Sequence, residues 1–412
     1  NWSAATKNQS QLLPVAPEPR ANNMTRTPIP RFEDNYSEEA AKARREFLTQ
    51  HTGASLQHTG TYSLPPESLK SNTENFIGVV QMPVGVAGPV LIHGEHAQGW
   101  FYVPLATTEG TLVASYSRGM RMVSESGGVK VTVAEEFMQR APLFEFEDAR
   151  AAKRFLNWLN ENLQTVKAEA EKTTGFGKLE HIQTWQVARM VYTRFHYTTG
   201  DAAGQNMCGK ATHAACQWVL KNSPEAITYF ALSGAIETDK KHSHMNLLHS
   251  RGKRVIAEAT IQREVLQRLA RTTPETIFKQ RQRSAIGAQL AGSAYSGPHS
   301  ANGIAALFIA TGQDEANVVE SHTGMVFMDI TADGDLYFSV TLPSVICATK
   351  GGGTGLSTQA ECLRMLGCEG SGKARKLAEI VGATVLAGDL SLLSAILADE
   401  WVSSHDAYGR NR

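Results

Sequence analysis

The sequence lacks the cysteine pattern of a disulfide framework or of a structural zinc site. Its 412 residues include five cysteines, an odd number without a CxxC pair, at positions Cys208, Cys216, Cys347, Cys362 and Cys368. Secreted scaffolds pair their cysteines, and zinc sites repeat them at short spacings. The pattern therefore indicates a reducing compartment, and we expect a cytoplasmic protein.

The chain also has no excess of charge of either sign. Forty lysines and arginines balance forty aspartates and glutamates, and no basic block stands out. Proteins that bind a phosphate backbone normally carry a basic face, so we expect no nucleic-acid partner. The apolar share of 42% and the charged share of 19% are those of a globular protein.

A signal peptide and a membrane span are missing as well. The chain opens with NWSAATKNQSQLLPVAPEPR, which has no apolar core, and without an initiator methionine, so residues can be missing upstream. The longest apolar run, 380–397, contains Asp389 and several small residues. A membrane span is normally longer and uncharged. We predict a buried helix there and no membrane span.

The common nucleotide and hydrolase motifs are absent. No GxGxxG follows a predicted strand, and no GxxxxGK[ST], GxSxG or HExxH occurs. Rossmann, P-loop, serine-hydrolase and zinc-protease assignments therefore have no support. His242 and His244 form an HxH pair, but no third ligand matches them, so no metal site is predicted.

A chain of this length exceeds one hydrophobic core, so two or three structural units are expected. Residues 1–35 are rich in Pro, Asn, Gln and Ser and are predicted to form a mobile arm. Ser37, the glutamates after it and Gly53 bound a predicted helix over 37–53.

The segment 142–231 has a distinctive order of elements. The stretches PLFEFED, KLEHIQTWQVA, MVYTRFHYTTG and AITYFALSG predict strands, and Ala149–Lys172 and AAGQNMCGKATHAACQWVLKN predict one helix each. The order β-α-β-β-α-β is that of a ferredoxin-like split βαβ unit. We predict a compact inserted module here, and the alternative that these strands continue the main sheet stays open.

The remainder predicts the elements of a larger domain. Helices are expected at PETIFKQRQRSAIGAQLAG and NGIAALFIATGQDEANVVES, a hairpin turning at Asp333–Gly334, and a glycine turn with a helix at GGGTGLSTQAECLRMLG. The predicted fold class is α+β: a large α/β domain with an inserted ferredoxin-like (βαββαβ) domain and a small helical N-terminal region.

Single polar residues stand in apolar or glycine-rich surroundings. Glu109 in VPLATTEGTLVAS is expected to turn to the interior, where its pKa would rise and suit a proton donor; a helix N-terminal carboxylate is the alternative. Asp314 in ATGQDEANVV is more typical of a charged loop. His405, beside Ser404, has the chemistry to protonate a leaving group or is an ordinary tail residue.

The densest polar group is TDKKHSH at 238–244. Asp239, Lys240 and Lys241 follow the last strand of the inserted module, where it returns to the larger domain. Clefts between domains are common ligand sites, and two lysines there can bind an anionic substrate and stabilise an oxyanion. A solvated turn is the alternative, and the residues alone favour it.

Two glycine-rich turns complete the candidates. TTGDAAGQNM places such a turn at a helix N-terminus, where free N–H groups and the helix dipole favour phosphate or pyrophosphate. TKGGGTG at 349–355 allows a second close approach of the backbone.

The motifs together identify a family. They occur in one order over residues 74–405: ENFIGVVQMPVGVAGPV, PLATTEG, LVAS, TGDAAGQNM, TDKK, SRGK, GQDEANVV, GGGT, AGDLSL and SSH. The chain resembles the 3-hydroxy-3-methylglutaryl-CoA (HMG-CoA) reductase family, and most closely its class I branch. The resemblance implies an oxidoreductase of the mevalonate (isoprenoid) pathway. It would reduce (S)-HMG-CoA to mevalonate and CoA with two NADPH, NADH being the alternative cofactor.

The resemblance also implies roles for single residues. Lys240 would stabilise the oxyanion, and Asp314 would keep Lys240 protonated and raise the pKa of Glu109. Glu109 would protonate the carbonyl oxygen, and His405 would protonate the departing thiolate. The substrate would be held by Glu74, Ser117, Arg118, Arg140, Ser233, Asp239, Lys241 and Asn302. The cofactor would be held by Thr174, Phe176, Asp201, Gly204, Gln205, Asn206 and Arg410.

The domain organisation implied by the resemblance follows the same motifs. Residues 1–73 would form the N-terminal arm and a small helical region. The large HMG-CoA-binding domain would comprise 74–141 and 243–412, the inserted NAD(P)-binding domain 142–231, and a connecting catalytic loop 232–242. Family members assemble as homodimers or homotetramers with the active site at the subunit interface, and the same is expected here.

The chain departs from the family pattern in places. DAMGMNM is DAAGQNM here, so Ala203 and Gln205 replace methionines, and DKKPAAIN is DKKHSHMN. Gly175 stands where class I has an arginine that holds the adenosine phosphate of the cofactor, which weakens the case for NADPH preference. The membrane anchor of eukaryotic members is absent, and Asn411 replaces the serine that some of them place next to the tail arginine.

Other functions stay open beside the reductase. One is a mevalonate-oxidising member of the family, and another is a non-catalytic acyl-CoA or nucleotide-binding scaffold on the same fold. A CoA-thioester hydrolase or transferase is a third. The retained set of Glu109, Lys240, Asp314 and His405 argues against the scaffold, and the absence of a nucleophile motif disfavours the hydrolase.

Overall fold

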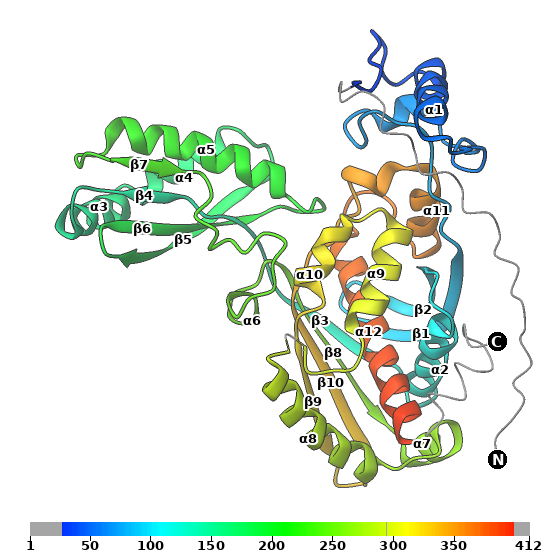
Figure 1. The fold of residues 1–412 in the computed structure, drawn as a ribbon. Coiled ribbons are helices and arrows are strands. Elements are labelled where there is room, and N and C mark those ends of the chain that lie inside the picture. Colours follow the sequence, from blue (N-terminus) through cyan, green and yellow to red (C-terminus); the bar gives the residue numbers. More distant parts are fainter. Residues whose placement is uncertain (1–26, 294, 399–412) are drawn as a thin grey trace, which may run out of the picture. The chain divides into compact units, whose positions relative to one another are not determined.

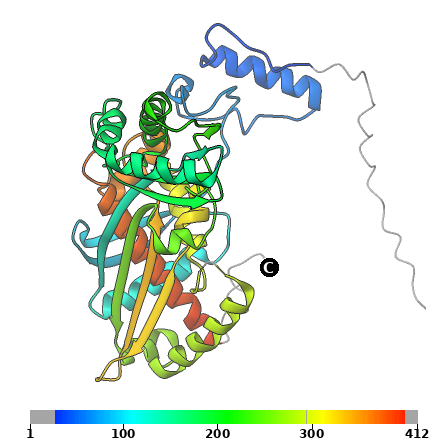
Figure 2. The same cartoon turned by 90° about the vertical axis from the view of Figure 1, so that its left-hand side faces the viewer.

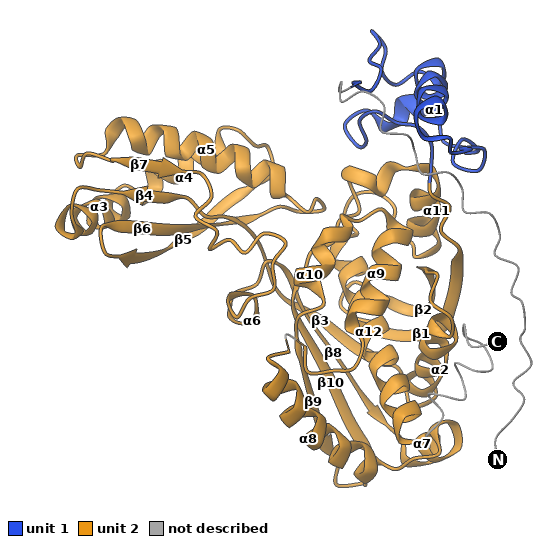
Figure 3. Ribbon diagram, in the orientation of Figure 1, with its two compact units in different colours: residues 1–79 blue, residues 80–412 orange. Residues whose placement is uncertain are grey.

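The computed structural model describes residues 27–293 and 295–398. The chain divides into two compact units, Asn1–Val79 and Val80–Arg412 (Figure 3). Most of the predicted N-terminal arm lies outside the described residues, and so does the tail that contains His405 and Arg410.

The first unit is built on helix α1 (Glu38–Thr52), and a short 3-10 helix, η1 (Pro66–Leu69), follows it. Ser37 caps α1 by accepting a backbone N–H of the first turn, and Gly53 ends the helix in the left-handed conformation with φ +72°. The predicted helix over 37–53 is confirmed.

The second unit contains a large sheet with the strand order β2–β1–β3–β8–β10–β9 (Figure 1). Neighbouring strands are antiparallel except β1 and β3, which are parallel. The strands are β1 (Val84–Gly94), β2 (Gln98–Ala106), β3 (Val129–Arg140), β8 (Gly252–Ile261), β9 (Met325–Ile330) and β10 (Leu336–Val345). The β9–β10 hairpin turns at Asp333–Gly334 as predicted, with Gly334 at φ +82°.

Helices surround this sheet. They are α2 (Leu112–Glu125), α6 (Met245–Leu248), α7 (Arg263–Ala270), α8 (Pro274–Ala291), α9 (Ser300–Thr311), η2 (Glu315–Asn317), α10 (Val318–Ser321), η3 (Gly352–Gly355), α11 (Ser357–Met365) and α12 (Ala374–Leu397). Helix α12 contacts β1, β3, β8 and β10 and lies along the strands in both views (Figures 1 and 2).

Helix α12 is long and largely apolar, and it forms the centre of the core. Within the described part of the chain it alone is long and apolar enough to cross a membrane, but most of its apolar window is buried inside the unit. A core helix passes the same test of length and composition. The prediction of a buried helix over 380–397 is confirmed.

Two fully buried carboxylates on α12 hold loops that are distant in sequence. Glu379 accepts hydrogen bonds from the backbone N–H groups of the turn at 95–97. Asp389 accepts from the backbone of His299 and from the hydroxyl of Tyr295. Burial raises the pKa of Asp389 to about 7, although these hydrogen bonds act in the opposite direction.

A smaller domain is inserted between β3 and β8. Its elements are β4 (Leu143–Glu145), α3 (Ala149–Glu161), α4 (Leu163–Glu171), β5 (Lys178–Val187), β6 (Met190–Thr198), α5 (Gln205–Asn222) and β7 (Tyr229–Ala231). Its strands are antiparallel in the order β7–β4–β6–β5, which is the ferredoxin-like arrangement, and it has a hydrophobic core of its own. The predicted α+β fold class is confirmed.

Strand β3 belongs to both sheets. Residues 130–137 pair with β8 of the large sheet, and residues 138–140 pair with β6 of the small one. The strand therefore delivers Arg140 to the junction of the two domains, and the loop from β7 to β8 returns through the same region.

Two of the predicted helices are interrupted. The helix expected over Ala149–Lys172 divides at Asn162, because its side-chain amide hydrogen-bonds the Trp158 carbonyl and competes with the helical pattern. The helix expected from 302 to 321 ends at Gly312, which adopts φ +68°. The second interruption creates the loop that carries Asp314.

Three histidines meet where the two sheets join. The rings of His181 on β5 and His196 on β6 stack with centroids 4.1 Å apart, and Gln183 hydrogen-bonds both His196 and His249. His196 is 2% exposed. Burial lowers its pKa to about 2, and the neighbouring charges of His181 and Arg194 act in the same direction.

Acid is expected to destabilise the protein through His196. Since its pKa in the folded state lies below the unfolded value of about 6.5, the unfolded state binds the proton preferentially, and stability falls as the pH decreases below 6.5. The expected loss is about 2 kcal/mol between pH 6.5 and pH 5. Urea unfolding at both pH values measures it. His196→Gln should remove most of this dependence, whereas His213→Gln, at an exposed position on α5, should leave it unchanged.

Candidate active site

The loop between β7 and α6 presents Lys240 to Asp314. Nζ of Lys240 lies 2.8 Å from Oδ2 of Asp314, and both side chains are partly exposed. The other carboxylate oxygen of Asp314 accepts the N–H of Ala316 at 3.2 Å and thereby caps η2. The charge-assisted contact fixes the direction in which the lysine points.

The backbone of this loop is held in an uncommon conformation. Ala235, Thr238 and Lys240 all adopt left-handed φ angles, which are +67°, +60° and +56°. Such angles are uncommon for residues other than glycine, and they persist where surrounding contacts enforce them. One such contact is the N–H of Lys240, which donates to Oε2 of Glu320 at 3.1 Å.

Glu320 is a fully buried carboxylate beneath the loop. It accepts from Nη1 of Arg251 at 2.7 Å and from Nδ2 of Asn246 at 3.3 Å. Burial raises the pKa of Glu320 to about 7, while the charge of Arg251 lowers it. No motif marks Glu320, because it stands in an ordinary helical run, and the SRGK motif contains Arg251 but does not indicate a role for it.

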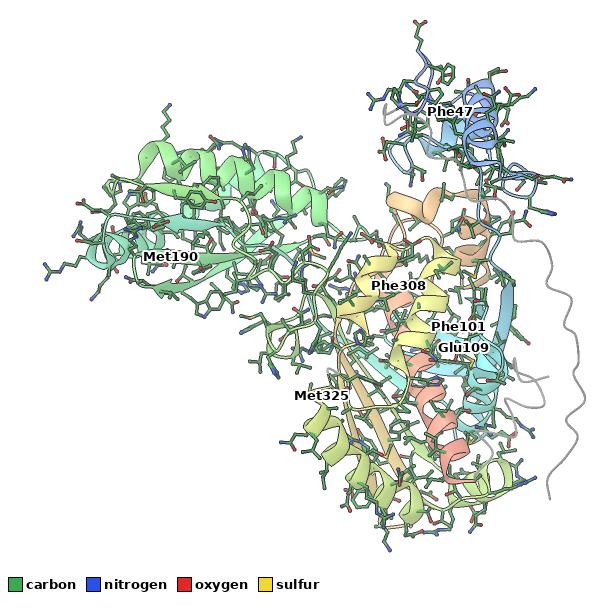
Figure 4. All side chains as sticks on the ribbon, viewed as in Figure 1. Phe47, Phe101, Glu109, Met190, Phe308 and Met325 are labelled. Atoms are coloured by element: carbon green, nitrogen blue, oxygen red, sulfur yellow. The ribbon has the colours of Figure 1, made fainter. Side chains whose placement is uncertain are left out.

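Glu109 lies in the turn between β2 and α2 and is exposed (Figure 4). The expectation that it turns to the interior is wrong: the flanking Leu105 and Leu112 fill the core, and the turn that joins them stays outside. Nδ2 of Asn302, in the first turn of α9, lies 3.3 and 3.2 Å from the two carboxylate oxygens of Glu109.

Glu109 and Lys240 belong to separate pairs within one chain. Asn302 contacts Glu109 at the start of α9, and Asp314 contacts Lys240 just beyond its end. The helix places roughly 14 Å between its residues 302 and 311. No hydrogen bond or ion pair among residues 80–293 and 295–398 joins the two pairs.

Three of the residues predicted to hold the substrate gather at the domain junction. Nη1 of Arg140 lies 3.9 Å from Oδ2 of Asp239 and 3.7 Å from Oε1 of Glu237, and the hydroxyl of Ser233 donates to the same Glu237 oxygen. A fourth predicted substrate residue, Lys241, donates from Nζ to the carbonyl of Asp239 at 3.0 Å. Glu237 was not among the sequence-based candidates.

Ser117 and Arg118 lie on α2 and line a separate pocket of about 770 Å³. Pro89, Trp100 and Leu269 give it an apolar wall. Arg118 is anchored on α12, where Nη2 donates to the carbonyl of residue 391 at 2.7 Å. The pocket is large enough for a small organic ligand.

The glycine turn before α5 is fixed to the large domain at two places. The carboxylate of Asp201 accepts the backbone N–H groups of residues 372–374 at the start of α12. Nε2 of Gln205 donates to Oδ1 of Asn317 at 2.9 Å and lies 3.4 Å from Oδ1 of Asp239. The turn therefore touches the loop that carries Lys240.

The same turn leaves the start of α5 open. Gly204 adopts φ +81°, and a Cβ there would meet the Thr199 side chain at 2.2 Å, so the position needs glycine. The N-terminus of α5 has no side-chain cap, and Asn206 in its first turn is exposed. On the same domain, Thr174 accepts the N–H of Phe176, whose ring is 90% exposed.

The remaining predicted residues lie outside the described part of the second unit. His405 and Arg410 lie outside the described residues. Glu74 belongs to the first compact unit and is exposed there. Their predicted roles in acid catalysis, cofactor binding and substrate binding therefore stay predictions.

Comparison with known proteins finds a family model and relatives that all carry the same family name. The model of the hydroxymethylglutaryl-coenzyme A reductase family matches residues 40–410. The 3-hydroxy-3-methylglutaryl-coenzyme A reductase of Pyrococcus abyssi is 43% identical over 379 residues, which are 90% of this chain and 93% of that protein. The enzyme of the same name from Methanothermobacter thermautotrophicus is 44% identical over 376 residues, 90% of this chain and 94% of that protein.

A solved structure has the same fold. It is a class II 3-hydroxy-3-methylglutaryl-CoA reductase from Streptococcus pneumoniae bound to NADPH in open conformations, with a TM-score of 0.67. The match covers 88% of this chain and 99% of that one at 21% identity. A likeness at this identity concerns the fold, so the class I branch stays a prediction.

Proposed function

The chain belongs to the hydroxymethylglutaryl-coenzyme A reductase family, and we propose that it reduces (S)-HMG-CoA to mevalonate and CoA with two NADPH in the cytoplasm. The observation that carries this proposal is the 2.8 Å pair of Lys240 and Asp314, which stands in a strained loop next to three predicted substrate residues. In a solvated turn, nothing would keep three residues in the left-handed conformation above a buried carboxylate.

The chemistry follows from where charge develops. When the thioester carbonyl is attacked, negative charge forms on its oxygen, and the ammonium group of Lys240 stabilises it. Asp314 orients that group through the ion pair. His405 would then protonate the thiolate as CoA departs, which leaves mevaldehyde. In the second reduction Glu109 would protonate the aldehyde oxygen, with Asn302 holding its carboxylate.

The nicotinamide cofactor would supply a hydride in each step. The residues present suit a dinucleotide, because the uncapped N-terminus of α5 follows a turn that only Gly204 permits, and such ends bind phosphate groups. Asn206 is exposed beside it. The contact of Gln205 with Asp239 would link this turn to the substrate loop.

The pocket at Ser117 and Arg118 suits the CoA part of the substrate. Its apolar wall of Pro89, Trp100 and Leu269 can cover the adenine or pantetheine chain, while Arg118 offers a cation for a phosphate group. Arg140 and Ser233 would bind the carboxylate at the other end of the substrate, that of the HMG group.

We also propose a homodimer or homotetramer whose active site is shared between subunits. Within one chain, Glu109 and Lys240 belong to pairs at opposite ends of α9. A general acid must come within hydrogen-bond reach of the oxygen that the lysine stabilises. A second subunit that supplies one of the two pairs would meet this requirement.

The test of the function is the oxidation of NADPH in the presence of HMG-CoA, followed by the absorbance of the reduced nicotinamide. Stoichiometric release of CoA thiol and mevalonate supports the reductase. Thiol release without oxidation of NADPH would indicate a thioester hydrolase instead. Reduction of NADP by mevalonate and CoA alone would favour the mevalonate-oxidising alternative, and binding without turnover would favour a scaffold.

Cofactor preference should depend on Gly175. We expect kcat/KM to be higher for NADPH than for NADH, but by a smaller margin than in class I enzymes, because glycine offers no phosphate-binding fork. The Cβ position of Gly175 is open, so Gly175→Arg fits without rearrangement and should raise the NADPH preference about tenfold. Steady-state kinetics with both dinucleotides measure it. A wild-type preference for NADH would contradict the prediction, and Gly287→Arg, at an equally open position on α8 outside this domain, is the control.

A further inference from the structure

Glu237 is a buried carboxylate for which the proposed mechanism has no use. It is 3% exposed and lies between Ala235 and Thr238 in the strained loop. The other carboxylates near the loop have clear tasks: Asp314 pairs with Lys240, and Glu320 holds the loop backbone.

The contacts of Glu237 are those that a substrate carboxylate would need. Its Oε1 accepts a hydrogen bond from the hydroxyl of Ser233 and lies 3.7 Å from Nη1 of Arg140. Ser233 and Arg140 are the donors that the proposed function assigns to the carboxylate end of the substrate. The side chain of Glu237 therefore presents a carboxylate to both of them.

The contact with Arg140 is incomplete. The separation of 3.7 Å exceeds a hydrogen bond, and Oε2 of Glu237 and Nε of Arg140 are buried without a hydrogen-bond partner in the described parts of the chain. By comparison, Asp239 in the same loop lies 2.9 Å from Arg251. Buried polar groups normally have partners, so an incomplete pair indicates a contact that is exchanged for another.

We propose that Glu237 occupies the carboxylate subsite of the free protein and yields Ser233 and Arg140 to the carboxylate of the substrate. This inference rests on the proposed function, which assigns those two donors. It makes Glu237 a specificity-determining residue, since a ligand without a carboxylate cannot replace it. The subsite is open at one side, where the Arg140 and Asp239 side chains are 21% and 26% exposed.

The exchange separates two like charges. The charged groups that face Glu237 are Arg140 from β3, Arg194 from β6 and Asp239 in its own loop. A second carboxylate at Arg140 adds negative charge beside Glu237, and like charges at close range repel each other. The carboxylate of Glu237 must therefore leave Arg140 when the substrate carboxylate binds there, and its charge opposes that binding.

Calorimetry of a small diacid tests the proposal. The probe is 3-hydroxy-3-methylglutarate, titrated at neutral pH into the wild-type protein and into Glu237→Gln. Glu237→Gln keeps the shape without the charge, so it should bind the diacid roughly tenfold more tightly than the wild type. Glu237→Ala also removes the charge and should show a gain in the same direction.

A matched control is available on β3. Glu135 also accepts from a serine hydroxyl, that of Ser250 at 2.7 Å, and lies 3.3 Å from Nε of Arg254. Glu135→Gln removes the same kind of carboxylate from outside the loop, and it should leave the affinity for the diacid unchanged.

The outcomes separate cleanly. Unchanged or weaker binding by Glu237→Gln overturns the inference and makes Glu237 a structural partner of Arg140. If Glu237→Gln does not fold, the same result with Glu237→Ala overturns it. If the diacid does not bind, the inference is wrong. Tighter binding by the variants without oxidation of NADPH by HMG-CoA would remove the proposed function and leave Glu237 as a residue that controls access to a carboxylate site.

Discussion

Replacement of Lys240 with alanine is expected to lower kcat for HMG-CoA reduction by about 100-fold or more. The ammonium group lies 2.8 Å from Oδ2 of Asp314, and its charge is needed only when the carbonyl oxygen becomes negative. The effect should therefore appear in kcat rather than in KM. The side chain is partly exposed, so its removal creates no cavity, and thermal unfolding should remain close to that of the wild type.

Lys241→Ala is the matched comparison for this change. Lys241 is the next residue, also a lysine, and among the described residues its Nζ hydrogen-bonds the loop carbonyl of Asp239. In its predicted substrate-holding role, its removal should mainly raise KM. Near-wild-type kcat in the Lys240 variant, or equal effects of the two changes, would show that Lys240 is not the group that stabilises the oxyanion.

Glu109→Gln is expected to lower the reduction of both HMG-CoA and free mevaldehyde, by about 100- to 10,000-fold. The aldehyde oxygen must be protonated whichever substrate is supplied, and glutamine cannot provide that proton. The exchange keeps a side chain that can still hydrogen-bond Asn302, so the loss should not come from the fold. Initial rates with each substrate measure it.

His405→Gln should give the contrasting pattern. Mevaldehyde has no sulfur leaving group, so the histidine variant should lose HMG-CoA reduction and keep most mevaldehyde reduction. Parallel loss of both activities in His405→Gln would assign the histidine to structure or to cofactor binding. Survival of mevaldehyde reduction in Glu109→Gln would refute the role of Glu109 as the acid.

Local signals predicted much of the fold. Ser37 and Gly53 bound α1, the Asp333–Gly334 turn forms a hairpin, and alternating strands revealed the ferredoxin-like order, because each of these is decided by residues close in sequence. The break at Gly312 was missed since apolar residues continue at helical spacing on both sides of it. A glycine within such a pattern is weak evidence until its φ is known.

The candidate site was predictable only in part. The motifs located Lys240 and Asp314. The groups that hold the loop come from segments that are far apart in the sequence. Arg251 and Glu320 are 69 residues apart, and in the sequence Arg140 precedes the inserted domain while Glu237 follows it. The prediction that Glu109 turns to the interior is wrong, because buried neighbours in the sequence do not require the turn between them to be buried. The neighbours are buried, and the turn between them is not.

Helix α12 determines when the large domain can finish folding during synthesis of the chain. Its Glu379 holds a turn 282 to 284 residues earlier, and its apolar surface covers β1, β3, β8 and β10. The inserted domain, with its own core, is complete by residue 231 and is able to fold first. At about 5–20 residues per second, roughly 10–50 s separate the synthesis of β3 from that of α12. During that time the nascent large sheet exposes the face that α12 will cover, and this apolar face is prone to aggregation until α12 packs on it.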